Sequence, residues 1–365
     1  MSIESGSISG RFLHVPRALP PDIVERFAAR AMPPLETLED GTIEGWVTGR
    51  HTLDRNITDE TAFHGGFLRM RLSQAERKIP NELLIAECRI EELAHLQAQG
   101  VEKVRGSVRR EIRRSVEERL LPQAQPHIHS MQLVHDDSAS RMITTAINDK
   151  QLDALQVHFT QAVGFSLVPE TPDLAAMKRC QVNVRDWSPS SFTPERDDEE
   201  VSHDPGLDFL TWLWFVAEAK SGLVKVEDMG QIGIMIEGPL LMVMEGAGSH
   251  EALVRKGEPM LSAETKGALL SGKKLRRAKL TLARGDQAWT CTMDAVSFVF
   301  RGLKLPEGEK LDIISKFQER MDLLRTFHDA FFGLFDIFVR VRTNGPLWHE
   351  ECKQIHAWVA NRRTR

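Results

Sequence analysis

The spacing of apolar residues changes several times along the chain, which predicts strands mixed with helices. Apolar positions that alternate with polar ones predict strands at residues 11–17, 42–49 and 65–73. The segment 20–32 has helical spacing, and two prolines stand near its start, where a helix tolerates them. The N-terminal region is therefore predicted to combine one helix with three strands.

A long helical pattern follows between Pro80 and Pro122. Its apolar residues keep helical spacing until Gly100, a residue that interrupts helices because of its conformational freedom. We therefore expect a helical hairpin or a kinked arm over residues 80–121.

The next segments return to short elements. Residues 131–136 and 141–148 predict a strand pair, 149–164 a helix and 165–172 a strand. Residues 172–205 contain four prolines and an acidic run, so they are expected to form a linker or an inserted loop.

The second half of the chain repeats this mixture. It predicts a helix over 207–222, a hairpin that turns at Gly238-Pro239, and a short helix capped by Ser262. Further segments have the pattern of strands, at 274–283, 288–294 and 296–305.

Two helices are predicted at the C-terminal end, over 307–342 and 347–363. Four phenylalanines lie on one face of the first helix: Phe327, Phe331, Phe335 and Phe338. Their spacing favours a core face over a dimer interface or a base-stacking surface.

The combined pattern predicts an α+β fold with mainly antiparallel sheets. The expected divisions are an N-terminal subdomain (11–79 with 130–171), a charged helical arm (80–129), a linker (172–205), a second α+β subdomain (206–305) and C-terminal helices (306–365).

Composition is typical of a globular protein. The 365 residues are 41% hydrophobic, no apolar run approaches the ~20 residues of a membrane span, and the first residues lack the pattern of a signal peptide. The four cysteines lie far apart, which argues against a disulfide framework or a zinc site. We expect a cytoplasmic protein without a membrane partner.

The formal net charge of −5 argues weakly against nucleic acid, but the charge is unevenly distributed. Four arginines occupy six positions of the segment 109–114. Val108, Ile112 and Val116 form an apolar stripe, and arginines lie beside it. The helix is either a solvated face or the wall of a groove that holds a polyanion. The candidate phosphate contacts on it are Arg105, Arg109, Arg110, Arg113 and Arg114.

A second basic segment spans residues 273–284 and contains no acidic residue before Arg284. Like-charged neighbours on a strand destabilise it unless solvent or an anion screens them, and only about half of these side chains can share one face. Its candidate DNA contacts are Lys273, Lys274, Arg276 and Arg277.

Other chemistry has weaker support. His127, His129 and His135 invite a metal site, but no cysteine completes a ligand set, so surface histidines are favoured. Asp197 and Asp198 lie in an acidic run that could supply a metal-dependent nuclease, although a solvated loop is favoured. The segment "LLSGKKL" lacks the first glycine and the hydroxyl of a P-loop. No catalytic residue, metal or cofactor is predicted.

The order of several motifs resembles the RdgC family of recombination-associated proteins. These motifs are "EGWV", "RKIPNELLIAECRIEEL", "REIRRSVEERLLPQA", the segment from "MQLVHD" to "LVPETP", and the segment from "LSAETKGALLSG" to "FRGLKLP". Each is weak alone, but together they cover most of the chain.

The resemblance implies a DNA-binding protein that is not an enzyme. Family members form a ring-shaped homodimer around double-stranded DNA, bind with little sequence preference, and restrain RecA by occupying the DNA. The expected location is the nucleoid. A metal-dependent exonuclease is the runner-up, and a protein-binding adaptor that ignores DNA is a third possibility.

Three segments depart from the family pattern. Residues 123–131 carry glutamines and histidines where relatives have phenylalanines and basic residues near the gate of the ring. The segment 172–205 is longer than expected, and the phenylalanine-striped C-terminal helix makes the chain larger. The first departure implies that the gate contact is built differently or is absent.

Overall fold

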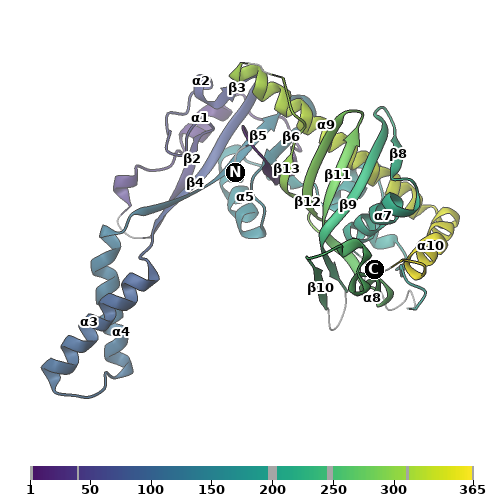
Figure 1. The fold of residues 1–365 in the computed structure, drawn as a ribbon. Coiled ribbons are helices and arrows are strands. Elements are labelled where there is room, and N and C mark those ends of the chain that lie inside the picture. The colour runs from purple at the N-terminus through teal and green to yellow at the C-terminus, as the bar shows by residue number, and fades with distance from the viewer. Residues whose placement is uncertain (1–2, 39–40, 196–203, 245–249, 310–311, 364–365) are drawn as a thin grey trace. The chain divides into compact units, whose positions relative to one another are not determined.

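The structure is a computed structural model, and it describes residues 3–38, 41–195, 204–244, 250–309 and 312–363. The chain divides into two compact units. The larger unit contains residues 1–17, 136–152 and 167–365, and the smaller unit contains residues 18–135 and 153–166. Helices and antiparallel strands are mixed in the described residues, which confirms the predicted α+β class (Figure 1).

An antiparallel sheet with the strand order β10-β9-β11-β12-β13-β1-β6 organises the larger unit. Two short strands extend it, because β7 pairs with β1 and β8 pairs with β9. The bounds are β1 (Ile8–His14), β6 (Arg141–Thr144), β7 (Val168–Pro169), β8 (Leu223–Val226), β9 (Gly230–Val243), β10 (Glu251–Val254), β11 (Lys274–Arg284), β12 (Gln287–Asp294) and β13 (Val299–Lys304).

Helices pack around this sheet and enclose an aromatic core. They are α6 (Pro172–Cys180), α7 (Pro205–Ala219), α8 (Ala263–Leu270), α9 (Ile313–Thr343) and α10 (Gly345–Ala360). Phe331 and Phe335 of α9 are fully buried, and their rings lie 5.6 and 5.1 Å from that of Phe209 on α7. The phenylalanine stripe of α9 is therefore a core face, as predicted.

The smaller unit contains the three-stranded antiparallel order β5-β4-β2 and the helical arm. Its elements are α1 (Ile23–Ala28), β2 (Thr42–Thr48), α2 (Asp59–Ala62), β3 (Phe63–His64), β4 (Phe67–Arg77), α3 (Asn81–Gln99), α4 (Gly106–Leu120), most of β5 (Pro126–Asp136) and most of α5 (Asp149–Val163). Trp46 and Phe27 centre its core, with ring centroids 4.6 Å apart.

The hairpin expected at Gly238-Pro239 is wrong, because both residues lie inside the single strand β9. The neighbouring strand β11 pairs on both sides of this dipeptide, opposite Glu237 and Leu241, and the register shifts between the two pairs. An irregularity of this kind absorbs extra residues without ending the strand. Pairing with β11 therefore carries the chain straight through a sequence that is typical of a turn.

The segment expected to be a linker contains ordered structure over its described part. Helix α6 and a short 3₁₀ helix (Val184–Asp186) occupy it, and Trp187 and Phe192 are buried. Its prolines misled the prediction because Pro172 stands at the start of α6, where the missing N–H costs nothing.

Two further boundaries differ near the N-terminus. The first strand runs over Ile8–His14 instead of 11–17 and pairs with β13 and β6, so it belongs to the larger unit. The first helix is shorter than expected, since Ala31 already pairs with Trp46 of β2.

Candidate nucleic-acid interface

The predicted helical arm is a hairpin of α3 and α4, which lie side by side (Figure 1). Gly100 ends α3 in the left-handed conformation, with a φ of 63°. Leu84 of α3 and Val116 of α4 are buried in the seam between the helices. The apolar stripe of the arginine helix therefore packs on α3, and its polar sides remain outside.

Ion pairs tie the two helices together. The Nε of Arg109 donates to Glu92 across 2.8 Å, and Arg119 donates to Glu87 across 2.9 Å. Glu92 is buried although it is charged, so Arg109 supplies the partner that a buried carboxylate needs. Among the candidate contacts, Arg109 therefore has a structural partner on α3, whereas Arg113 and Arg114 pair, among the described residues, only within α4.

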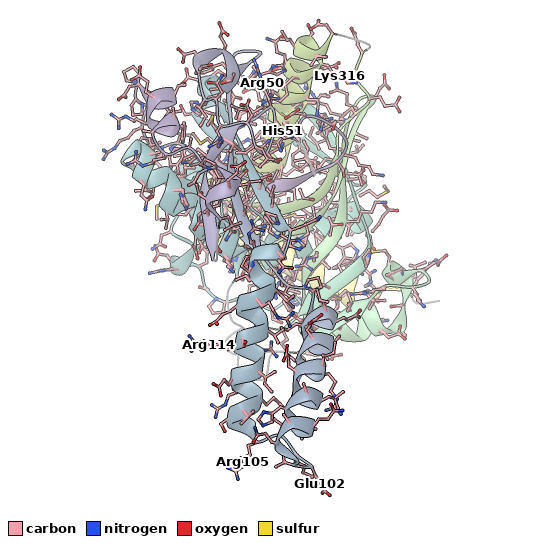
Figure 2. The ribbon with its side chains drawn as sticks, turned by 90° about the vertical axis from the view of Figure 1, so that its left-hand side faces the viewer. Arg50, His51, Glu102, Arg105, Arg114 and Lys316 are labelled. Carbon is pink, nitrogen blue, oxygen red and sulfur yellow. The ribbon has the colours of Figure 1, made fainter. Side chains whose placement is uncertain are left out.

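Three arginines present their charge outward along α4. Within the described residues, Arg105 and Arg110 form no ion pair, and the side chain of Arg114 is 82% exposed although it pairs with Glu118. Figure 2 shows Arg105 at the tip of the arm and Arg114 directed away from α3.

Two arginines of this helix form ion pairs with glutamates one turn further along it. Arg113 contacts Glu117 and Arg114 contacts Glu118, both at 2.9 Å. Exposed pairs of this kind stabilise by only about 0–1 kcal/mol, so a phosphate can replace the carboxylate at little cost. Loss of these two ion pairs would therefore cost the helix little stability.

The basic strand β11 finds its carboxylates on neighbouring strands. Arg277 contacts Asp294 of β12 across 2.6 Å, and Lys279 contacts Glu237 of β9 across 2.7 Å. Arg276 lies 3.5 Å from Glu251 of β10. The anions that screen this strand thus include acidic side chains of the same sheet, which the sequence of the strand alone did not reveal.

Lys274 corrects the expectation that it faces DNA. Its side chain is buried, and its Nζ contacts the buried Asp208 of α7 across 2.5 Å. The adjacent Lys273 donates to Ser271 across 3.2 Å. Lys274 therefore stabilises the larger unit and is not accessible to a phosphate.

Among the described residues, the structure does not bring the other candidate side chains together into a site. In the part of the chain that the structure describes, no three histidine, cysteine, aspartate or glutamate side chains lie together as metal ligands. His127 and His129 are exposed on β5, whereas His135 is buried. Asp197 and Asp198 lie outside the described residues.

Cysteine chemistry adds nothing to the arm. Burial raises the pKa of the Cys88 thiol on α3, and the positive charge of Arg113 opposes this only in part. The thiol therefore stays protonated at neutral pH.

Sequence reasoning missed Arg119, which belongs to the same helix and bridges to α3. The glutamates Glu87 and Glu91 on α3 could have indicated this bridge. The contact nevertheless depends on how the two helices of the hairpin pack against each other. It also missed a cluster of charged side chains along α9, described below.

No model of a known protein family matches the sequence, and no curated protein matches it either. None of the helices among the described residues has both the length and the apolar character needed to cross a bilayer.

Proposed function

We propose that this protein binds double-stranded DNA without sequence preference. In this proposal it acts as a nucleoid-associated homodimer that encircles the duplex and limits the access of RecA. The observation that carries the DNA-binding part is the outward charge of α4, where Arg105, Arg110 and Arg114 are exposed. The ring and the antagonism with RecA rest on the resemblance to the RdgC family.

The chemistry of the arm supports phosphate contacts and gives no support for base recognition. Exposed arginines at the start of a helix and along it can donate to phosphate oxygens of a backbone, and such contacts position DNA without distinguishing sequence. Each neutralised phosphate releases condensed counterions, so affinity should fall steeply with salt.

Self-association has separate support on α3. Leu83, Ile90 and Leu93 share one face of this helix, and each side chain is at least 45% exposed. Large apolar side chains grouped on a surface favour contact with a protein partner, and a homodimer supplies the same face twice.

The deciding experiment measures the affinity for labelled duplex DNA across a salt series, with and without magnesium. We compare the wild type with Arg105→Gln/Arg110→Gln/Arg114→Gln. The wild type should bind tightly at low salt and leave the DNA intact, and the variant should lower the slope of log affinity against log salt by about 2–3.

A matched control removes the same charge elsewhere. Arg17, Arg30 and Arg55 are exposed and lie outside the arm, so their triple glutamine variant should keep the wild-type slope. Equal losses in both variants would contradict a site on α4. Shortening of the DNA only with magnesium would favour the nuclease, and absence of binding at low salt would favour the adaptor.

A further inference from the structure

A pocket of about 230 Å³ lies within the larger unit, away from the arm sequence. Its walls come from the end of β1, the start of β6, β7, helix α6 and helix α9. The side chains that matter below are Arg141, Glu170, Leu174, Lys178 and Phe332. The proposed DNA-binding function uses none of them.

Arg141 is the unusual group in this pocket. Its side chain is only 13% exposed, yet its buried Nε has no hydrogen-bond partner. Its nearest carboxylate oxygens belong to Glu170 and Asp329, at 3.9 and 3.8 Å, beyond hydrogen-bonding distance. Burying even one guanidinium N–H without an acceptor is costly.

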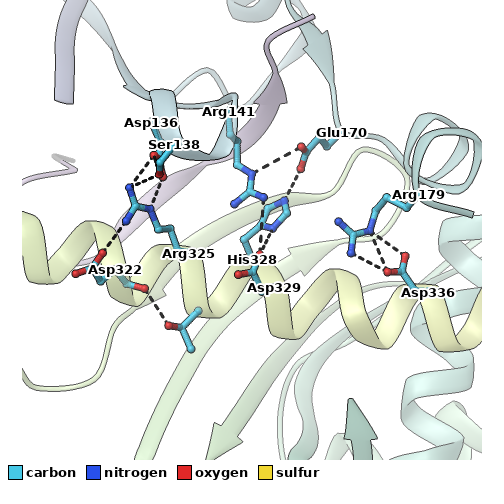
Figure 3. Close-up of polar contacts among 11 residues, drawn as sticks. Asp136, Ser138, Arg141, Glu170, Arg179, Asp322, Arg325, His328, Asp329 and Asp336 are labelled. Carbon is cyan, nitrogen blue, oxygen red and sulfur yellow. Dashed lines mark hydrogen bonds and ion pairs between the residues drawn. The ribbon is translucent and has the colours of Figure 1, made fainter. Parts of the chain in front are cut away.

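The two carboxylates are oriented toward another partner. Glu170 lies 2.7 Å from Nε2 of His328, and Asp329 lies 3.1 Å from Nδ1 of the same ring (Figure 3). Because His328 is buried between them, both carboxylates are held at a distance from Arg141. Arg179, beside them, is likewise held by two hydrogen bonds from different nitrogens to Asp336.

Further positive charge borders the same space. Lys178 of α6 lines the pocket and forms no ion pair within the described residues. Burial lowers the pKa of Arg141 and also that of Lys178, and the negative charge of Glu170 offsets this only in part. An added anion would favour the charged form of both groups.

We propose that this pocket binds a small organic anion with a carboxylate or phosphate head. The head accepts hydrogen bonds from Arg141 and forms an ion pair with Lys178. The body of the ligand is apolar, because Leu174 and Phe332 line the remaining wall. The volume lies below the roughly 300–1,000 Å³ of sites for drug-sized molecules, so the ligand is small.

The test uses the full chain and three probes: phenyl phosphate, benzoate and inorganic phosphate. Calorimetric titration should show saturable binding of one molecule of phenyl phosphate or benzoate per chain. Inorganic phosphate should bind at least tenfold more weakly, since it lacks the apolar body. No saturable binding of either aromatic anion overturns the proposal, and so does equal affinity for inorganic phosphate.

Variants assign the binding to this pocket. Arg141→Gln should abolish it, and Lys178→Gln, a change at an exposed position that leaves the core intact, should weaken it about tenfold, the equivalent of 1.4 kcal/mol. Leu174→Trp should block the pocket by volume without changing charge. Lys225→Gln, at an exposed residue of β8 that does not line this pocket, should bind as the wild type does.

Wild-type affinity in both Lys178→Gln and Leu174→Trp would overturn the assignment even if Arg141→Gln fails to fold. The arm variant Arg105→Gln/Arg110→Gln/Arg114→Gln should keep the anion affinity. The pocket and the DNA-binding proposal can therefore fail independently.

Discussion

Basic side chains of this protein differ most in how far each is removed from water. Arg114 is 82% exposed, so its pair with Glu118 is screened and exchangeable. Lys274 is buried against Asp208 at 2.5 Å, and Arg342 approaches the same carboxylate at 3.9 Å. Basic side chains thus serve the surface in one place and the core in another, according to how far each is removed from water.

This contrast predicts the effect of Lys274→Met. The variant takes the closest ion-pair partner from the buried Asp208 carboxylate, so the free energy of unfolding should fall by about 3–5 kcal/mol, measured by chemical denaturation. Lys273→Met, at the neighbouring residue, should change it by no more than about 0.5 kcal/mol. Wild-type stability in Lys274→Met, together with a lower salt slope for DNA binding, would return Lys274 to the DNA interface.

A second residue-scale prediction concerns the buried Asp136, to which Arg325 of α9 donates across 2.7 Å (Figure 3). Burial alone would raise the pKa of Asp136, but hydrogen bonds from Arg325 and Ser138 hold it below the usual value of 3.8. The stabilisation is therefore present above pH 3.8 and is lost as the pH falls through the lower pKa of the folded state.

Arg325→Ala should lower the free energy of unfolding at pH 7 by about 1.5–3 kcal/mol, since a charged hydrogen bond is lost. The difference from the wild type should shrink below about pH 4 as Asp136 takes up a proton. Denaturation at pH 7 and pH 3 measures both values. An equal difference at the two pH values would mean that Arg325 acts through packing instead.

At the scale of elements, the arm depends on the chain reversal between α3 and α4. Gly100 closes α3 with positive φ, a conformation in which a Cβ is disfavoured. Gly106, at the start of α4, has no such constraint, and a Cβ there would meet no atom within 4 Å. Substitution by a residue with a Cβ is therefore disfavoured at Gly100 and tolerated at Gly106.

Gly100→Ala should destabilise the arm by about 1–2 kcal/mol, the cost of the left-handed conformation for a residue with a Cβ. Gly106→Ala should leave it unchanged or stabilise it by up to about 1 kcal/mol, because alanine loses less entropy in a helix. Amide hydrogen exchange along α3 and α4 reports this locally. Equal protection in both variants would show that the turn does not limit arm stability.

At the scale of the whole molecule, the proposed function requires a second copy of the chain. The exposed apolar residues Leu83 and Ile90 of α3 offer a contact for it, whereas the exposed Ile85 lies about 140–160° around the helix from both of them. These two faces allow the location of a dimer contact to be tested with substitutions of the same kind.

Ile90→Glu should shift the protein from dimer to monomer, because a charge placed in an apolar contact is costly to desolvate. Ile85→Glu should leave the dimer intact. Sedimentation or light scattering over a concentration series measures the change. A dimer that persists in Ile90→Glu would place its interface elsewhere.

Features that depend on neighbours along the chain could be predicted from the sequence. Helical spacing and Gly100 predicted the arm, Ser262 predicted the cap of α8, and the phenylalanine stripe predicted a buried face of α9. Each of these signals acts within a few residues, so periodicity and local chemistry are sufficient to detect it.

Which charges meet and which strands pair depends on contacts between distant parts of the folded chain. Lys274 and Asp208 lie 66 residues apart, and the carboxylates beside Arg277 and Lys279 come from adjacent strands. The Gly238-Pro239 dipeptide stays within β9 because β11 pairs with it on both sides. The energy of a buried charge or a sheet ladder depends on partners distant in sequence, and these become neighbours only when the chain has folded.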